Sequence, residues 1–222
     1  MSLRTLSTAT VVALTGAFTL VFFYAPNDAD QGFIQKIFYV HVPMAMVALG
    51  GFVAGGVCAI QHLRTRRSEW DLRSYVFIHL SLILGVGVLI TGSIWAKIAW
   101  GRWWIWSEDE LVLFLVLYLF YCAYFMLRFS VDPGPQRANL SAVYALFGVV
   151  LIPVSFSAIR LAKAYFHPQV FTLHGPNFGG WILVTYCIAQ AAMLVLAYTL
   201  YRLELGGKQL DVRMRRLREV LA

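Results

Sequence analysis

The chain has 222 residues, of which 60% are hydrophobic and only 13% are charged. Several apolar runs approach or exceed the ~20 residues with which a helix crosses a bilayer, so the composition excludes a soluble globular domain and indicates a polytopic membrane protein. The net charge of +7 is not evidence for a nucleic-acid partner, because membrane proteins acquire basic loops for topological reasons.

Six apolar segments follow one another along the chain, and each predicts a membrane-spanning helix. Their approximate bounds are 6–24, 43–61, 75–95, 111–127, 140–159 and 178–201. We therefore expect an all-α fold in which residues 1–222 form a single six-helix transmembrane domain. The first segment is long for the apolar part of a signal peptide, and no cleavage site of the A-x-A type follows it.

The approach to the second span has its own pattern. Apolar residues recur at helical spacing between positions 33 and 38, which predicts a short helix lying along the membrane surface. The second span then begins near Pro43, since proline is tolerated in the first turn of a helix. Small residues along this span, among them Gly51, Gly55 and Gly56, are expected to let another helix approach closely.

The distribution of positive charge predicts the orientation in the membrane. Six spans place both termini on one side. Arg4, the loops 62–74 and 128–139 and the C-terminal tail hold 13 of the 18 Lys and Arg residues, and the other three connections hold 5. Because cytoplasmic loops carry the excess of Lys and Arg, we expect cytoplasmic termini. The connection 97–110, between the third and fourth spans, then faces outward.

This outward connection is rich in tryptophan. Five of the seven Trp residues fall within the twelve positions 95–106. An aromatic belt at the membrane interface explains one or two Trp per helix end, but explains five in one connection poorly. The alternative is a flat apolar platform for a large planar ligand, with Arg102 at its edge for an anionic group. The platform residues would be Trp95, Trp100, Trp103, Trp104 and Trp106.

Acidic residues follow the tryptophans directly. The segment Ser107-Glu108-Asp109-Glu110 precedes an apolar run and matches a capping box, with Ser107 as N-cap and Glu110 three residues later. Carboxylates also suit the positive end of a helix dipole. We interpret these residues as a helix start. The competing hypothesis is a membrane enzyme that uses a histidine together with these acids.

Three histidines are expected on the same outward face, namely His41, His167 and His174. Iron in haem takes imidazole nitrogen as an axial ligand, and tryptophan faces stack on a porphyrin. Haem therefore fits the combination. On position alone, each histidine also has an ordinary explanation, as a polar tip at the membrane edge or as a loop residue. His62 and His79 lie toward the opposite face, where we expect His79 to hydrogen-bond another helix.

Other site chemistry is not indicated. The three cysteines lie in separate apolar runs without a C-x-x-C pair, and no H-E-x-x-H motif is present, so we predict no catalytic residues and no metal apart from haem iron.

Two segments carry a family resemblance. Phe38-Tyr39-Val40-His41-Val42-Pro43 is similar to the Y-x-H-V-P signature of the CcmC family of cytochrome c maturation, which belongs to the haem-handling proteins that share a WWD domain. Trp100-Gly101-Arg102-Trp103-Trp104-Ile105-Trp106 is similar to the W-G-x-W-W-x-W motif of the same family. The family motif continues with Asp where this chain has Ser107. A role of that carboxylate would therefore need Glu108 or Asp109.

The resemblance covers nearly the whole chain and implies a function. It implies that a b-type haem is bound non-covalently and transiently on the external face, between the Trp-rich loop and two axial histidines. His41 matches the first ligand. We favour His167 as the second because it needs an insertion of about one residue, whereas His174, which matches the last letters of the family segment better, needs a larger one and stays the alternative. Arg102 and Arg160 are the candidates for contacting the propionates.

The resemblance also implies partners and a location. Haem would pass to a membrane-anchored CcmE-type chaperone, alongside CcmA- and CcmB-type transporter subunits and a small CcmD-type subunit. It implies a delivery protein rather than an enzyme, in the bacterial or archaeal cytoplasmic membrane, with its functional loops facing the periplasm or exterior. The alternative is a permease subunit that moves a substrate through a Gly- and Ser-rich core, although acidic clusters deep in the spans are lacking.

Overall fold

A computed structural model describes residues 2–27, 31–161, 167–168, 170–172 and 174–221. The described residues form six long helices, and all six are long and apolar enough to cross a membrane. The prediction of an all-α, six-span membrane protein is therefore confirmed. The long helices are α1 (Leu3–Thr19), α2 (Phe38–Thr65), α3 (Ser68–Trp100), α4 (Asp109–Ser130), α5 (Pro135–Leu161) and α6 (Gly180–Leu221).

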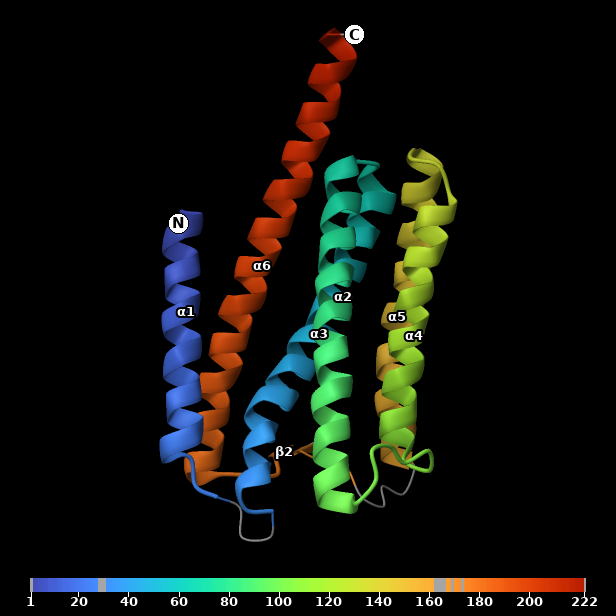
Figure 1. Cartoon of the computed structure of the whole chain (residues 1–222). Helices are drawn as coiled ribbons and strands as arrows, with labels where there is room; N and C mark the ends of the chain where they lie inside the picture. The colour runs from blue at the N-terminus through green and yellow to red at the C-terminus, as the bar shows by residue number, and fades with distance from the viewer. Residues whose placement is uncertain (1, 28–30, 162–166, 169, 173, 222) are drawn as a thin grey trace.

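Short elements complete the ends of these helices. A π-helical turn, η1 (Leu20–Tyr24), extends α1, and a 3-10 turn, η2 (Phe33–Ile37), precedes α2. Between α5 and α6, β1 (Phe171–Thr172) and β2 (Gly175–Pro176) pair as an antiparallel hairpin. Figure 1 shows both chain termini at one end of the bundle, and shows this hairpin and the α3–α4 connection at the other end.

Helix α2 is the centre of the bundle, since it packs against α3, α5 and α6. Its glycines permit this, as the sequence predicts. A Cβ at Gly55 would lie 2.8 Å from Ile78 Cγ1 of α3, and a Cβ at Gly56 would overlap Val149 Cγ2 of α5. The Ser74 hydroxyl also donates to the Gly55 carbonyl at 2.8 Å, which ties α3 to α2.

Two polar pairs join helices at the end that carries the termini. Arg128 of α4 donates to both carboxylate oxygens of Asp71 on α3, at 2.8 and 2.7 Å. His79 of α3 contacts Glu204 of α6, with 2.8 Å between Nδ1 and Oε1, so the prediction that His79 bonds another helix is confirmed.

The start of α2 differs from the prediction. We expected a separate surface helix over 33–38 and a span beginning near Pro43, but η2 leads directly into α2, which begins at Phe38. Pro43 is therefore the sixth residue of the helix. Its missing N–H removes only the bond to the Tyr39 carbonyl, one turn earlier, which a helix of 28 residues tolerates. As a result, His41 belongs to a helix and not to a connection.

The helices also extend beyond the predicted apolar spans. Helix α3 continues through Trp95 to Trp100, and only Arg66 and Arg67 separate it from α2. Hydropathy marks the apolar middle of a helix, whereas the backbone continues to form helical hydrogen bonds through its polar ends. Residues 97–100 of the predicted Trp-rich connection are therefore helical.

The capping-box prediction is wrong. Helix α4 begins at Asp109, and Glu108 occupies the N-cap position with φ −91° and ψ 104°. The Glu108 carbonyl accepts the hydrogen bond of Val112 N, as an N-cap carbonyl does. The side chains of Glu108 and Glu110 both contact His167 in the segment that follows α5.

Candidate functional site

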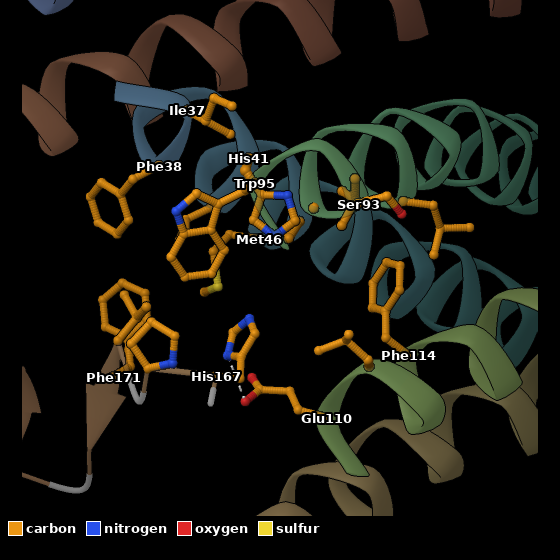
Figure 2. A pocket seen from close by; sticks show the side chains of 18 of the residues that line it. Ile37, Phe38, His41, Met46, Ser93, Trp95, Glu110, Phe114, His167 and Phe171 are labelled. Atoms are coloured by element: carbon orange, nitrogen blue, oxygen red, sulfur yellow. Dashed lines mark ion pairs between the residues drawn. The ribbon is translucent and has the colours of Figure 1, made fainter. Parts of the chain in front are cut away.

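A cavity of about 360 Å³ opens at the bundle end that holds the α3–α4 connection. This volume lies within the roughly 300–1,000 Å³ that is usual for small-molecule sites. Helices α2, α3, α4 and α5, the 167–178 connection and the start of α6 all contribute to its wall. Six predicted site residues line it, namely His41, Trp95, Trp100, Trp103, Trp104 and His167. Figure 2 shows the two imidazoles on opposite sides of the open space.

His41 is placed by α2 and held by α3. Its Nδ1 lies 2.9 Å from the hydroxyl oxygen of Thr91. That hydroxyl donates its own hydrogen to the Gly87 carbonyl at 2.7 Å, so its oxygen accepts from Nδ1–H of His41. The other ring nitrogen, Nε2, then carries the free lone pair that a metal ligand needs.

His167 is held by two acidic residues at the start of α4. Its Nδ1 lies 2.9 Å from Glu110 Oε2, and the dashed line in Figure 2 marks this ion pair. The contact does not meet the geometry of a hydrogen bond. Its backbone N–H donates to Glu108 Oε2 at 3.4 Å, and the Glu108 side chain is fully buried. The start of α4 therefore positions both the backbone and the ring of His167.

Two tryptophans pack around the same imidazole. The Trp95 and Trp100 rings lie edge-to-face with His167, at centroid distances of 6.1 and 6.3 Å. The two indoles are 5.1 Å apart and tilted by 57°, and Trp104 and Trp106 are tilted by 65°. The indoles in each pair are therefore angled to one another and do not form the single flat platform that the sequence suggested. Trp106 is 72% exposed and lies outside the cavity lining.

The inner wall of the cavity is apolar. Phe38 of α2 packs edge-to-face on Phe178 at 5.2 Å, and Phe178 packs on Phe171 at 5.8 Å. These contacts fasten the β1–β2 hairpin to α2 beside the cavity. Deeper in the bundle, the lining continues with Met46, Leu49, Phe114, Leu117 and Ile152. An apolar floor of this kind favours the hydrophobic part of a planar ligand.

The remaining predicted residues lie elsewhere. His174 is exposed at the tip of the β1–β2 hairpin, where its N–H donates to the Thr172 hydroxyl, and it does not line the cavity. Arg102 is exposed in the α3–α4 connection and is also outside the lining. The side chain of Arg160 lies outside the described part of the structure. The propionate contacts of Arg102 and Arg160 therefore stay predictions.

Sequence reasoning missed the partners of the two histidines. Thr91 lies one helical turn before Trp95, so the two side chains share a face of α3, and this spacing was a usable signal. Glu110 was assigned to the helix start, and no local pattern connects it with a residue 57 positions later.

Among the described residues, Glu110 is the one charged side chain in the cavity lining. Across the same described residues, no group of three or more His, Cys, Asp or Glu side chains could hold a bare metal ion.

Comparison with known proteins identifies the family. The family model for CcmC, described as heme exporter protein C, matches residues 1–219. The chain belongs to the CcmC family. The resemblance that the sequence motifs suggested is thereby confirmed, and the motif histidine and most of the motif tryptophans of this family member line one cavity.

Individual relatives agree with this assignment. The heme exporter protein C of Rhodobacter capsulatus is 29% identical over 214 residues, which cover 95% of this chain and 86% of that protein. The protein of the same name from Paracoccus denitrificans is 29% identical over 204 residues, with 90% and 82% covered. The Escherichia coli protein of that name is 31% identical over 149 residues, with 67% and 60% covered.

Proposed function

We propose that this protein binds haem between His41 and His167 and delivers it for the maturation of c-type cytochromes. The observation that carries the proposal is the meeting of two imidazoles, from α2 and from the segment after α5, in one cavity walled by tryptophan. The names of the relatives agree, since they are called heme exporters, and a relative from Marchantia polymorpha is called a putative cytochrome c biosynthesis protein.

The chain supplies each kind of contact that haem requires. The Nε2 atoms of His41 and His167 are the axial ligands, and the apolar floor receives the hydrophobic edge of the ring. Trp95, Trp100, Trp103 and Trp104 flank the ring, and Arg102 and Arg160 pair with the propionates at the mouth. Haem is cargo here, a b-type group held without a covalent bond, and the protein has no enzymatic role.

The mouth of the cavity is also the exit in this proposal. Trp103 and Trp106 are 59% and 72% exposed, so they offer apolar surface beside the bound haem. A CcmE-type chaperone docks there and receives the haem, with CcmA- and CcmB-type transporter subunits and a CcmD-type subunit in the same assembly. The mouth faces the periplasmic or external side of a bacterial or archaeal cytoplasmic membrane, as the excess of Lys and Arg at the opposite end favours.

Haem titration of the purified protein in detergent, followed by visible absorption, tests the binding proposal. We expect a low-spin spectrum for the wild type that is lost in His41→Ala and in His167→Ala. His174→Ala is the matched control, because this exposed histidine lies outside the cavity, and it should keep the spectrum. A wild type without a specific haem spectrum, or with one that survives both substitutions, contradicts the proposal and favours a permease subunit.

A further inference from the structure

We infer that Thr91 and Glu110 are positioning residues that make the two haem-binding imidazoles unequal. This inference rests on the proposed function, because it concerns the groups behind His41 and His167. Thr91 holds His41 through a neutral hydroxyl, and Glu110 holds His167 through a carboxylate. The first sets which nitrogen of His41 faces the haem, and the second raises the electron donation of His167 to the iron.

The hydroxyl partner selects one tautomer of His41. Thr91 has a single hydroxyl hydrogen, and the Gly87 carbonyl takes it at 2.7 Å, with the Val88 carbonyl at 3.3 Å. Its oxygen is therefore an acceptor toward Nδ1 of His41, 2.9 Å away. A valine at position 91 keeps the shape but removes the hydroxyl acceptor, so the Nδ1 proton is held less firmly, with the Val88 carbonyl left as a backbone acceptor for the ring. A fraction of His41 then presents N–H to the iron, and this form cannot bind.

The carboxylate partner acts by charge. Glu110 Oε2 lies 2.9 Å from Nδ1 of His167, and the two side chains are 32% and 17% exposed, so water screens the pair only in part. A carboxylate behind a metal-bound imidazole raises the basicity of the ligand. Its negative charge also favours the form of the cargo with the higher positive charge, which is ferric haem. Glu110 therefore strengthens ferric binding more than ferrous binding.

The two residues thus predict different responses. Thr91→Val should weaken ferric and ferrous haem binding by a similar factor, of about 10- to 100-fold, the usual effect of losing a group behind a metal ligand. Glu110→Gln should weaken ferric binding by about tenfold or more and ferrous binding less, so that the midpoint potential of the bound haem moves to a more positive value. A merely structural role of Glu110 would not separate the two oxidation states.

Matched controls exist at sites away from the cavity. Thr10 of α1 is buried and shares a 2.6 Å contact with Thr199 of α6, so Thr10→Val removes a hydroxyl from another helix interface. Glu204 pairs with Nδ1 of His79 at 2.8 Å, so Glu204→Gln changes an equivalent Glu–His pair. Thr91→Ser keeps the hydroxyl and should bind haem as the wild type does.

The experiment measures ferric and ferrous haem affinity, the absorption spectrum and the midpoint potential for the purified wild type and all five variants. The inference is upheld if Thr91→Val loses affinity in both states, Thr91→Ser does not, and Glu110→Gln alone moves the potential in the positive direction. It is overturned if the wild type binds haem through both histidines while Thr91→Val and Glu110→Gln behave like Thr10→Val and Glu204→Gln. If the wild type binds no haem, the proposed function is wrong, and the inference that rests on it is overturned with it.

Discussion

A single glycine determines how closely α3 approaches the imidazole of His41. A Cβ built at Gly92 would lie 2.9 Å from Cε1 of the His41 ring, which is closer than carbon atoms pack. The ring is also tied to Thr91, the preceding residue of α3, so it cannot turn away without losing that bond. Gly92 and Thr91 together fix the position of the proposed ligand.

Replacing Gly92 with alanine should therefore displace the His41 ring while leaving the fold intact. We expect haem affinity to fall by about tenfold or more, as for other groups that support a metal ligand. Gly16→Ala is the control, since a Cβ there meets no atom within 4 Å. Titration with haem checks both variants, and equal affinity for Gly92→Ala and the wild type would contradict this role.

The Trp-rich connection divides into an inner and an outer part at the scale of the element. Trp95 and Trp100 end α3 and pack against His167, whereas Trp106 points outward and is 72% exposed. Tryptophans within the same twelve positions therefore lie in two environments, some beside His167 in the cavity and one at the surface. The inner part supports the proposed ligand, and the outer part is available to a partner.

Alanine substitutions should separate these two parts. Trp100→Ala removes a ring that packs on His167, so haem affinity should fall by about tenfold or more. Trp106→Ala should keep haem affinity within about twofold of the wild type, because surface substitutions usually have small effects, but should slow transfer to a CcmE-type chaperone. Stopped-flow absorption after mixing haem-loaded protein with the chaperone measures the transfer. Normal transfer by Trp106→Ala would exclude this residue from docking.

Close packing of α2 on α3 holds His41 of α2 beside Thr91 of α3. Gly55→Ala would bring a Cβ to 2.8 Å from Ile78 Cγ1, and overpacking of this kind usually costs about 1–3 kcal/mol. We expect a lower thermal unfolding midpoint in detergent, with partial recovery in Gly55→Ala/Ile78→Ala. Gly50→Ala lies on the same helix in open space, and it should be neutral or slightly stabilising. A Gly55→Ala protein as stable as Gly50→Ala would refute the close contact.

At the scale of the whole molecule, the proposed haem site and a buried ion pair that stabilises the fold lie at opposite ends of the bundle. The cavity lies at the end of the bundle that holds the α3–α4 connection (Figure 1). The Asp71–Arg128 pair joins the first turn of α3 to the last turn of α4, at the other end of these helices. Both side chains are largely buried, with exposed fractions of 16% and 7%. Removing one partner therefore leaves a charge that water cannot reach fully.

We expect Asp71→Asn to reduce the free energy of unfolding by about 3–5 kcal/mol, which is typical of breaking a buried ion pair. Haem affinity of the folded fraction should not change, because neither residue lines the cavity. Replacing both residues, as in Asp71→Leu/Arg128→Leu, should recover much of the stability, since no buried charge remains. Thermal unfolding and haem titration of the same preparations measure both effects. A loss of affinity without a loss of stability would contradict this separation.

Local patterns determined the class of protein, the number of helices and the end of the bundle at which the site lies. Hydrophobic spans are read from neighbouring residues, and an alternating path through six spans brings the 97–110 connection and the segment after α5 to the same end. The two motifs around His41 and Trp100–Trp106 were sufficient to assign the family. All of this depends on short stretches of chain, which is why the sequence alone contains it.

Tertiary structure decided the details of the site. It made His41 part of a helix, placed His167 in the cavity and His174 outside it, and turned the tryptophan rings at angles to one another. It also paired Thr91 with His41 across 50 positions and Glu110 with His167 across 57. Such contacts depend on how closely α2, α3 and α4 pack, and so on residues such as Gly55 and Gly92 whose partners lie far along the chain. The spacing of residues within one segment does not determine how closely two helices pack.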